Sequence, residues 1–294
     1  DRLSKGNENT YGRESLMAYE YELLTVNIIN RQAEVVIDNS PINLMTPKLY
    51  NELGHLCIEL EVDENLSVVV FKSANPDFFI AHFDVEAILD FPTDQEPERS
   101  EELNPFHQMC ERVRTMDKVT IAQIEGRVGG GGSEFVSSMD MRFGVINQTI
   151  INQMEVPIGI LPGGSGTQRL PRLIGMGRAM EVVLGGGDLD AKTAERWGYL
   201  NRLFEADQIN DWISKFAQRI AKFPVQAVRL AKAAVLASER PLEEGLKEEA
   251  FLFAQLLRTQ NAQSQMRQFL ELGGQTKEGE LRVGELSGEL EIKK

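Results

Sequence analysis

The chain has few of the residues on which metal sites and disulfide scaffolds depend. Its 294 residues include three histidines and two cysteines. The histidines, His55, His82 and His107, are too scattered for the spacing of a metal site, so we expect no metal. Cys57 and Cys110 each fall within an apolar helical pattern. We therefore expect two buried free thiols rather than a disulfide.

Long apolar runs and an excess of basic charge are also missing. No stretch approaches the roughly 20 apolar residues that cross a bilayer, and residues 1–20 lack the apolar core of a signal peptide. We therefore expect a cytoplasmic protein without membrane contact. The 45 acidic and 31 basic residues give a formal net charge of −14, which argues against nucleic acid as the main partner. An anionic small molecule remains compatible, because local basic groups and helix ends can oppose the overall charge.

Four segments differ in their residue patterns. Residues 1–20 carry no periodic pattern and are expected to be disordered or to derive from cloning. In residues 21–205, strand-like apolar runs alternate with helical patterns, which is typical of an α/β core. Residues 206–272 are expected to form a helical region. In residues 273–294 the triplet Gly-Glu-Leu recurs without a helical stripe, so we expect a low-complexity acidic tail that extends into solvent.

Four consecutive glycines, Gly129–Gly132, are the most informative local feature. They follow a predicted buried strand at 119–124 and lead into a helix that we expect to start at Ser133. Backbone without side chains leaves its N–H groups open to a ligand, and a helix start adds unpaired donors. Such a place suits an oxygen that gains negative charge during a reaction. A flexible linker is less favoured, and the glycine order matches neither a phosphate loop nor a dinucleotide fingerprint.

Two carboxylates, Glu134 and Glu155, each lie beside glycine-rich backbone. In a shared apolar cleft they would push each other's ionisation apart, which is the condition for paired acid and base catalysis. Spacing alone leaves surface carboxylates equally compatible with the sequence. Ser165, in the second glycine-rich turn, only approximates a nucleophile elbow and is expected to cap the following helix.

Three blocks resemble the crotonase (enoyl-CoA hydratase/isomerase) superfamily. They are Phe79–Asp84, Glu125–Glu134, and Gln153–Glu155 with Leu161–Leu170, in the family's order within residues 21–270. The resemblance implies an α/β fold built as a spiral of ββα units, with a C-terminal helical trimerisation region. It also implies an acyl-CoA thioester as substrate, a homotrimer or dimer of trimers, and no cofactor beyond the coenzyme A carried by the substrate.

The resemblance also implies roles for individual residues. The backbone N–H groups of Phe83 and Gly131 would form an oxyanion hole, and Glu134 and Glu155 would add water to a trans-2-enoyl-CoA. Ala81 would lie near the adenine of coenzyme A through its main chain. Three adjoining residues are expected to contact the substrate: His82, Gly130 and Gly163.

Several positions depart from the family's pattern. His82 replaces the usual glycine of the oxyanion loop, and Met154 replaces a proline that often precedes the second glutamate. Arg127 and Gly129 also differ from the usual residue types. The paired glutamates favour a hydratase, with an isomerase, a decarboxylase, a thioester hydrolase or a non-catalytic binding module as alternatives. For His82 we favour a loop residue tolerated for its shape over a role in acyl-group recognition.

Overall fold

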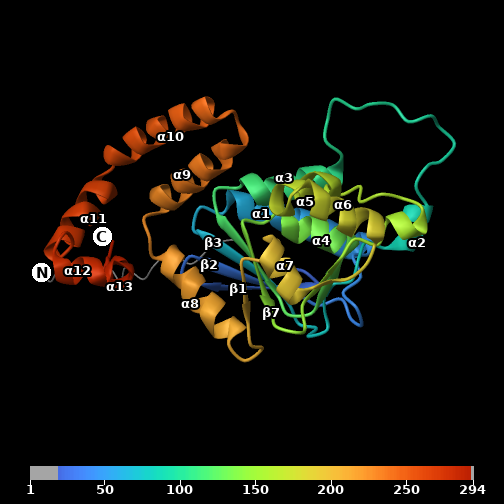
Figure 1. Ribbon diagram of the computed structural model, residues 1–294, viewed down its shortest axis with the longest axis horizontal. Helices are drawn as coiled ribbons and strands as arrows, with labels where there is room; N and C mark the ends of the chain where they lie inside the picture. Colours follow the sequence, from blue (N-terminus) through green and yellow to red (C-terminus); the bar gives the residue numbers. More distant parts are fainter. Residues whose placement is uncertain (1–18, 293–294) are drawn as a thin grey trace, which may run out of the picture.

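Two sheets form the centre of the molecule in this computed structural model, which describes residues 19–292 (Figure 1). The larger sheet has the order β1-β2-β3-β5-β7-β10 and the smaller sheet the order β4-β6-β8-β9. The strands of the larger sheet are β1 Leu24–Ile29, β2 Gln32–Ile37, β3 Val68–Ser73, β5 Val119–Ile124, β7 Met141–Val145 and β10 Arg202–Phe204. The smaller sheet contains β4 Phe78–Ile80, β6 Arg127–Gly129, β8 Ile150–Asn152 and β9 Leu189–Asp190.

The chain repeats one connection three times. A strand of the large sheet is followed by a strand of the small sheet and then by helix, in β3-β4-α2, β5-β6-α4 and β7-β8-α5. The helices are α2 Val85–Leu89, α4 Gly130–Ser137 and α5 Gly166–Ile174. This is the predicted succession of ββα units. Because β4, β6 and β8 are parallel neighbours, the segments that leave them meet at one edge of the small sheet.

Helices cover both faces of the large sheet. On one face, α1 Pro47–Val62 buries Leu49, Leu53 and Leu56, and α3 Pro105–Thr115 packs beside it. Both helices begin with proline after a capping side chain, as the sequence predicts for α1. On the other face, α8 Ile209–Ala221 packs against alternate residues of the strands, including Val68 and Val70.

The last helices extend away from the sheets. Figure 1 shows α10 Leu242–Leu257 and α11 Gln260–Glu271 beyond α9 Val225–Leu236. The remaining elements are α6 Met176–Gly185, α7 Ala191–Trp197, α12 Lys277–Leu281, α13 Val283–Glu289, and two short 3₁₀ turns, η1 Val156–Ile158 and η2 Ala237–Glu239. Among residues 19–292, no helix is long and apolar enough to cross a membrane.

The prediction of a solvated tail without helix is wrong. Residues 277–289 form α12 and α13, and Leu286 is fully buried. Thr276 caps α12 by accepting the Gly279 N–H at 3.1 Å, and Arg219 of α8 donates to the Gly284 carbonyl at 2.5 Å. The leucines are spaced too unevenly for a helical stripe, and the Arg219 contact comes from a helix 65 positions earlier in the sequence.

Two further sequence predictions can be compared with the structure. Helix α4 begins at Gly130 rather than at Ser133, with Gly129 as its capping residue. The two cysteines are buried free thiols, as predicted. The prediction for residues 1–20 lies almost wholly outside the described residues.

Candidate active site

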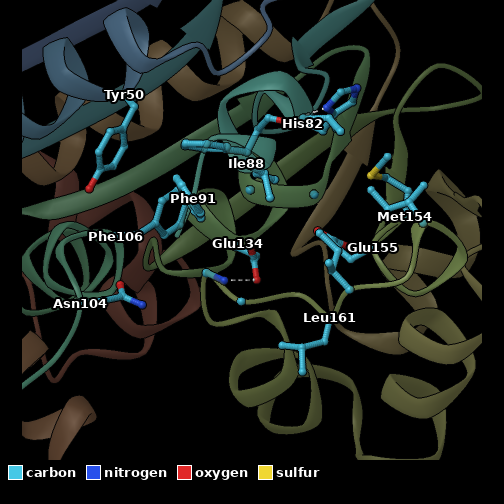
Figure 2. A pocket seen from close by; sticks show the side chains of 18 of the residues that line it. Tyr50, His82, Ile88, Phe91, Asn104, Phe106, Glu134, Met154, Glu155 and Leu161 are labelled. Carbon is cyan, nitrogen blue, oxygen red and sulfur yellow. Dashed lines mark hydrogen bonds between the residues drawn. The ribbon is translucent and has the colours of Figure 1, made fainter. Parts of the chain in front are cut away.

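The ends of β4, β6 and β8 and the turn before α5 surround a cavity of about 420 Å³. Glu134, Glu155, Phe83 and Gly131 all line it, and Figure 2 shows the two carboxylates close together at its wall. Most of the remaining wall is apolar and includes Val85, Ile88, Phe91, Ile158, Ile160 and Leu161. The fold therefore brings together four residues that are spread over more than 70 positions of the chain.

The glycine run is required by a close approach between α4 and the end of β4. A β-carbon on Gly132 would lie 2.7 Å from the Ile80 side chain, and one on Gly129 would lie 2.6 Å from the Ala81 carbonyl oxygen. At Gly131 the distance to the Phe83 β-carbon would be 3.2 Å. Ordinary contacts between carbon atoms are about 3.5–4.0 Å. Only glycine lets these two segments lie this close.

Two backbone N–H groups at this contact have no acceptor in the part of the chain that the structure describes. The residues on either side of Phe83 both pair with Met45. The His82 carbonyl accepts from the Met45 N–H, and the Asp84 N–H donates to the Met45 carbonyl. No acceptor for the Phe83 N–H itself lies among residues 19–292. Gly131 is the second residue of α4, where an N–H has no partner within its own helix. Both residues are therefore able to donate to a ligand in the cavity.

Glu134 is held by two amides from the turn before α5. Its Oε1 accepts the N–H of Gly164 at 2.9 Å and that of Gly166, the first residue of α5, at 2.7 Å. The residue is 3% exposed. Burial raises the pKa of Glu134 to about 8, opposed by the two amides and assisted by the negative charge of Glu155. This carboxyl therefore retains its proton at neutral pH far more readily than an exposed glutamate.

Glu155 follows β8 and is the capping residue immediately before the 3₁₀ turn η1. The buried Gln153 donates its amide to both carboxylate oxygens, at 3.0 and 3.1 Å. Burial raises the pKa of Glu155, while hydrogen bonds and the charge of His82 oppose the rise. Each carboxyl is buried, and the negative charge of Glu155 disfavours ionisation of Glu134. The pair therefore favours a state with one proton.

The other sequence-predicted residues divide into two groups. His82, Gly130 and Gly163 line the cavity, whereas Ala81 is buried outside it. The His82 Nδ1 lies 2.8 Å from the Phe83 carbonyl oxygen, which can only accept, so Nδ1 carries the hydrogen. The carbonyl of Gly163 accepts from the His107 ring at 2.8 Å.

Ser165 does not cap α5 through its side chain, contrary to the sequence prediction. Its backbone is left-handed, with φ +102°, and its hydroxyl makes no hydrogen bond to an N–H of the first turn. The hydroxyl oxygen instead accepts from Arg169 Nε at 2.8 Å. The Arg169 contact and the left-handed backbone of Ser165 explain why the residue does not form the side-chain cap that the local sequence predicts.

Aromatic residues that the sequence does not single out complete the cavity. The rings of Tyr50 and Phe106 stack at 5.7 Å with an angle of 7° between their planes, and Phe83 meets Phe106 edge-on at 6.2 Å. Asn104, the cap of α3, also lines the cavity. The sequence shows the capping residues at which α1 and α3 begin. Which residues of those helices reach the cavity depends on how they pack.

Comparison with known proteins agrees with this fold. The chain is 30% identical over 255 residues to the probable enoyl-CoA hydratase of Rhizobium meliloti, covering 85% of this chain and 95% of that protein. It is 28% identical over 240 residues to the short-chain-enoyl-CoA hydratase of Clostridium acetobutylicum, covering 81% and 90%. The structure of Pseudomonas aeruginosa DspI superposes with a TM-score of 0.78 at 28% identity, over 88% of this chain and 97% of that one. The family model for enoyl-CoA hydratase/isomerase matches residues 30–277, and the chain belongs to this family of enzymes.

Proposed function

We propose that the protein is an enoyl-CoA hydratase, which reversibly adds water across the C2–C3 double bond of a trans-2-enoyl-CoA. One observation carries this proposal. Two buried glutamates, Glu134 and Glu155, line a single cavity beside the free N–H groups of Phe83 and Gly131. The names of the Rhizobium and Clostridium relatives are consistent with it.

The Phe83 and Gly131 N–H groups are proposed to hold the thioester oxygen. That oxygen becomes negative when hydroxide adds at C3 and electron density moves through C2 to C1. Fixed donors stabilise this charge without reorganising during the reaction, and the loss of one such donor typically costs about 10²–10³ in rate. The glycine run supports this role because it lets α4 pack closely against the end of β4, and Phe83 and Gly131 both line the cavity.

The two glutamates are proposed to divide the proton transfers. The ionised carboxylate takes a proton from a water molecule held between the pair, and the resulting hydroxide bonds to C3. The protonated carboxyl delivers its proton to C2. The state with one proton, which burial of both carboxyls and the repulsion of Glu134 by Glu155 favour near neutral pH, is therefore proposed as the active state. Release of the product leaves the pair with one proton again.

The rest of the substrate is proposed to use the apolar part of the cavity. Residues such as Ile88, Phe91 and Leu161 suit a hydrocarbon acyl chain, which has no polar groups to satisfy. The reaction as proposed needs no cofactor other than the coenzyme A of its substrate.

We also propose that the chain assembles as a homotrimer or a dimer of trimers. The outlying helix α10 exposes large apolar side chains, among them Leu242, Phe251 and Phe253, with exposed fractions of 78%, 58% and 62%. Apolar area of this kind commonly marks a protein interface.

Turnover of a substrate panel tests the proposed function. Purified protein is mixed with crotonyl-CoA and longer trans-2-enoyl-CoAs, and the absorbance of the conjugated thioester is followed. We expect loss of absorbance for at least one chain length and no activity in either Glu134→Gln or Glu155→Gln. Retained activity in Glu155→Gln alone would indicate chemistry that uses a single carboxylate, such as isomerisation.

A further inference from the structure

The two amides that hold Glu134 lie on either side of a strained residue. Ser165 has φ +102° and ψ −2°, a left-handed conformation that residues with a side chain rarely adopt. This conformation orients the Gly164 and Gly166 N–H groups toward the same carboxylate oxygen. If Ser165 relaxed to a negative φ, the two N–H groups would turn apart and Glu134 would lose at least one of them.

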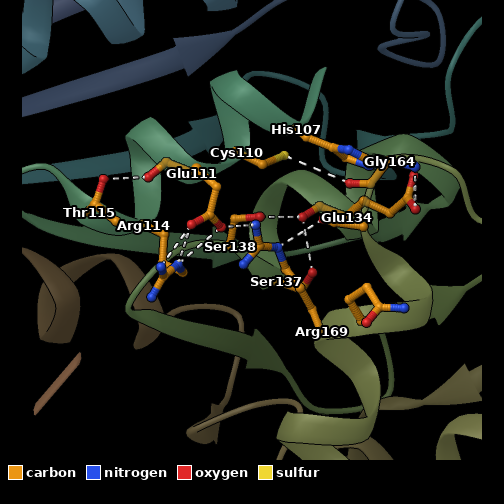
Figure 3. A network of polar contacts seen from close by, with 12 residues as sticks. His107, Cys110, Glu111, Arg114, Thr115, Glu134, Ser137, Ser138, Gly164 and Arg169 are labelled. Atoms are coloured by element: carbon orange, nitrogen blue, oxygen red, sulfur yellow. Dashed lines mark hydrogen bonds and ion pairs between the residues drawn. The ribbon is translucent and has the colours of Figure 1, made fainter. Parts of the chain in front are cut away.

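Arg169 is placed to hold Ser165 in that conformation. Its Nε donates to the Ser165 hydroxyl oxygen at 2.8 Å, and its Nη2 donates to Glu111 Oε1 at 2.6 Å. The Arg169 side chain is 13% exposed. Figure 3 shows the guanidinium between α3, which carries Glu111, and the helix that carries Glu134. An arginine fixed by a partner on a second helix can restrain Ser165 more firmly than a contact within α5 alone.

Glu111 is itself held in place. Arg114 donates to it through Nε and a terminal nitrogen, at distances of 2.7 to 3.1 Å. Arg114 also contacts Glu239 at 3.1 Å. The partner of Arg169 is therefore fixed on α3 rather than free to follow the motion of α5.

We propose that Arg169 is a positioning residue for Glu134, because it holds Ser165 left-handed and so keeps both amides on one carboxylate oxygen. The inference rests on the proposed acid–base role of Glu134. Arg169 does not line the catalytic cavity, so its effect is indirect. Its positive charge also acts on Glu134 in the direction of a lower pKa.

A rescue experiment separates this role from a general structural one. Arg169→Met removes the guanidinium and replaces the aliphatic part of the arginine with an unbranched apolar side chain. Ser165→Gly supplies a residue that adopts a positive φ without restraint. With crotonyl-CoA we expect Arg169→Met to lower kcat by about tenfold or more with little change in KM, because a displaced acid or base loses part of its contribution of roughly 10²–10⁴. In the Ser165→Gly background, the same substitution is expected to cost less than about threefold, because glycine needs no restraint there.

Arg172→Met is the matched control. Arg172 lies on the same helix, is exposed, and donates to the carbonyl of Gln168 at 2.6 Å within that helix. Its replacement is expected to leave kcat unchanged. Equal losses for Arg169→Met in both backgrounds, or an unchanged kcat, would overturn the proposal.

Hydrogen–deuterium exchange of residues 161–168 gives a readout that does not depend on turnover. Arg169→Met is expected to speed exchange at Gly164 and Gly166, and to do so less in the Ser165→Gly background. If the wild-type protein hydrates no enoyl-CoA and the variants still show this exchange pattern, the proposed function fails and the positioning role stands. If Arg169→Met does not fold, Ser165→Ala replaces it as the test, because it removes the hydroxyl and keeps the Arg169–Glu111 pair. An unchanged kcat and exchange rate in Ser165→Ala would contradict the proposal.

Discussion

Replacement of Gly164 by alanine should disable the site while leaving the fold intact. A β-carbon at this position would lie 2.4 Å from Glu134 Oε2 and 2.6 Å from the Phe106 ring. Gly164 does not have a positive φ, so the alanine backbone is itself unstrained. The cost therefore comes from the clash with the carboxylate and the ring.

The overlap sets the size of the expected effect. Relative to an ordinary contact of about 3.5 Å, the carboxylate or the turn has to move by about 1 Å. A displacement of about 1 Å at a reacting group can lower the rate by about 10²-fold. The Gly164 N–H at 2.9 Å from Glu134 would be displaced with it. We expect kcat to fall by about 10²-fold, and the free energy of unfolding to fall by about 1–3 kcal/mol through overpacking.

Steady-state kinetics with crotonyl-CoA and urea unfolding measure these two quantities. Gly177→Ala in α6 is the control, since the added β-carbon would have no atom within 4 Å beyond its chain neighbours and the backbone of its own helix. It should keep full activity and gain about 0.5–1 kcal/mol of stability, because alanine favours a helix over glycine. A Gly164→Ala variant with wild-type kcat would refute the argument that Glu134 must occupy its present position.

Three further predictions concern stability. Burial raises the pKa of Glu134 from 4.5 to about 8, so the folded protein binds this proton more tightly than the unfolded chain, and stability should fall as pH rises between those values. Glu134→Gln should remove this pH dependence and raise the free energy of unfolding near pH 8 by up to roughly 5 kcal/mol, measured by urea unfolding near pH 5 and pH 8. Asn104→Ala removes the oxygen that accepts the His107 N–H at 2.8 Å and should cost about 1 kcal/mol in urea unfolding, whereas Asn104→Asp should cost less. Leu286→Ala should abolish the protection of α13 against hydrogen–deuterium exchange, whereas Leu281→Ala, at a position 80% exposed, should not. Equal protection of α13 in the two variants would contradict the packing of the last helix.

Local signals predict the elements whose ends are fixed by nearby residues. Thr46 and Pro47 predict the start of α1, because a cap and a preset φ act within one turn. The residues at 23–29 and 33–37 predict the hairpin of β1 and β2, which the structure pairs over 24–29 and 32–37. These features need no information from the rest of the chain.

The start of α4 shows where local signals fail. Glycine is a poor helix former, so propensity favours a start at Ser133. The helix begins at Gly130 because its first turn packs against Ile80 and Phe83, where a side chain would overlap. That requirement arises from β4 and the loop after it, about 50 residues earlier in the chain.

The partners of Glu134 cannot be predicted from the local sequence for the same reason. The sequence indicates Glu134 and Glu155 as candidates, and the fold places both at one cavity. The amides of Gly164 and Gly166 come from 30 and 32 positions away, and nothing near Glu134 points to them. Ser165 reads locally as a cap, and its contact with Arg169 is visible only in the structure.

The most direct measurement is the fate of the oxygen of water during turnover. An enoyl-CoA that the protein consumes is incubated in oxygen-18-labelled water, and the product is analysed by mass spectrometry with fragmentation of the acyl group. We predict a 3-hydroxyacyl-CoA that carries one labelled oxygen at C3. A product with the mass of the substrate, free coenzyme A, or a shortened acyl chain would contradict it.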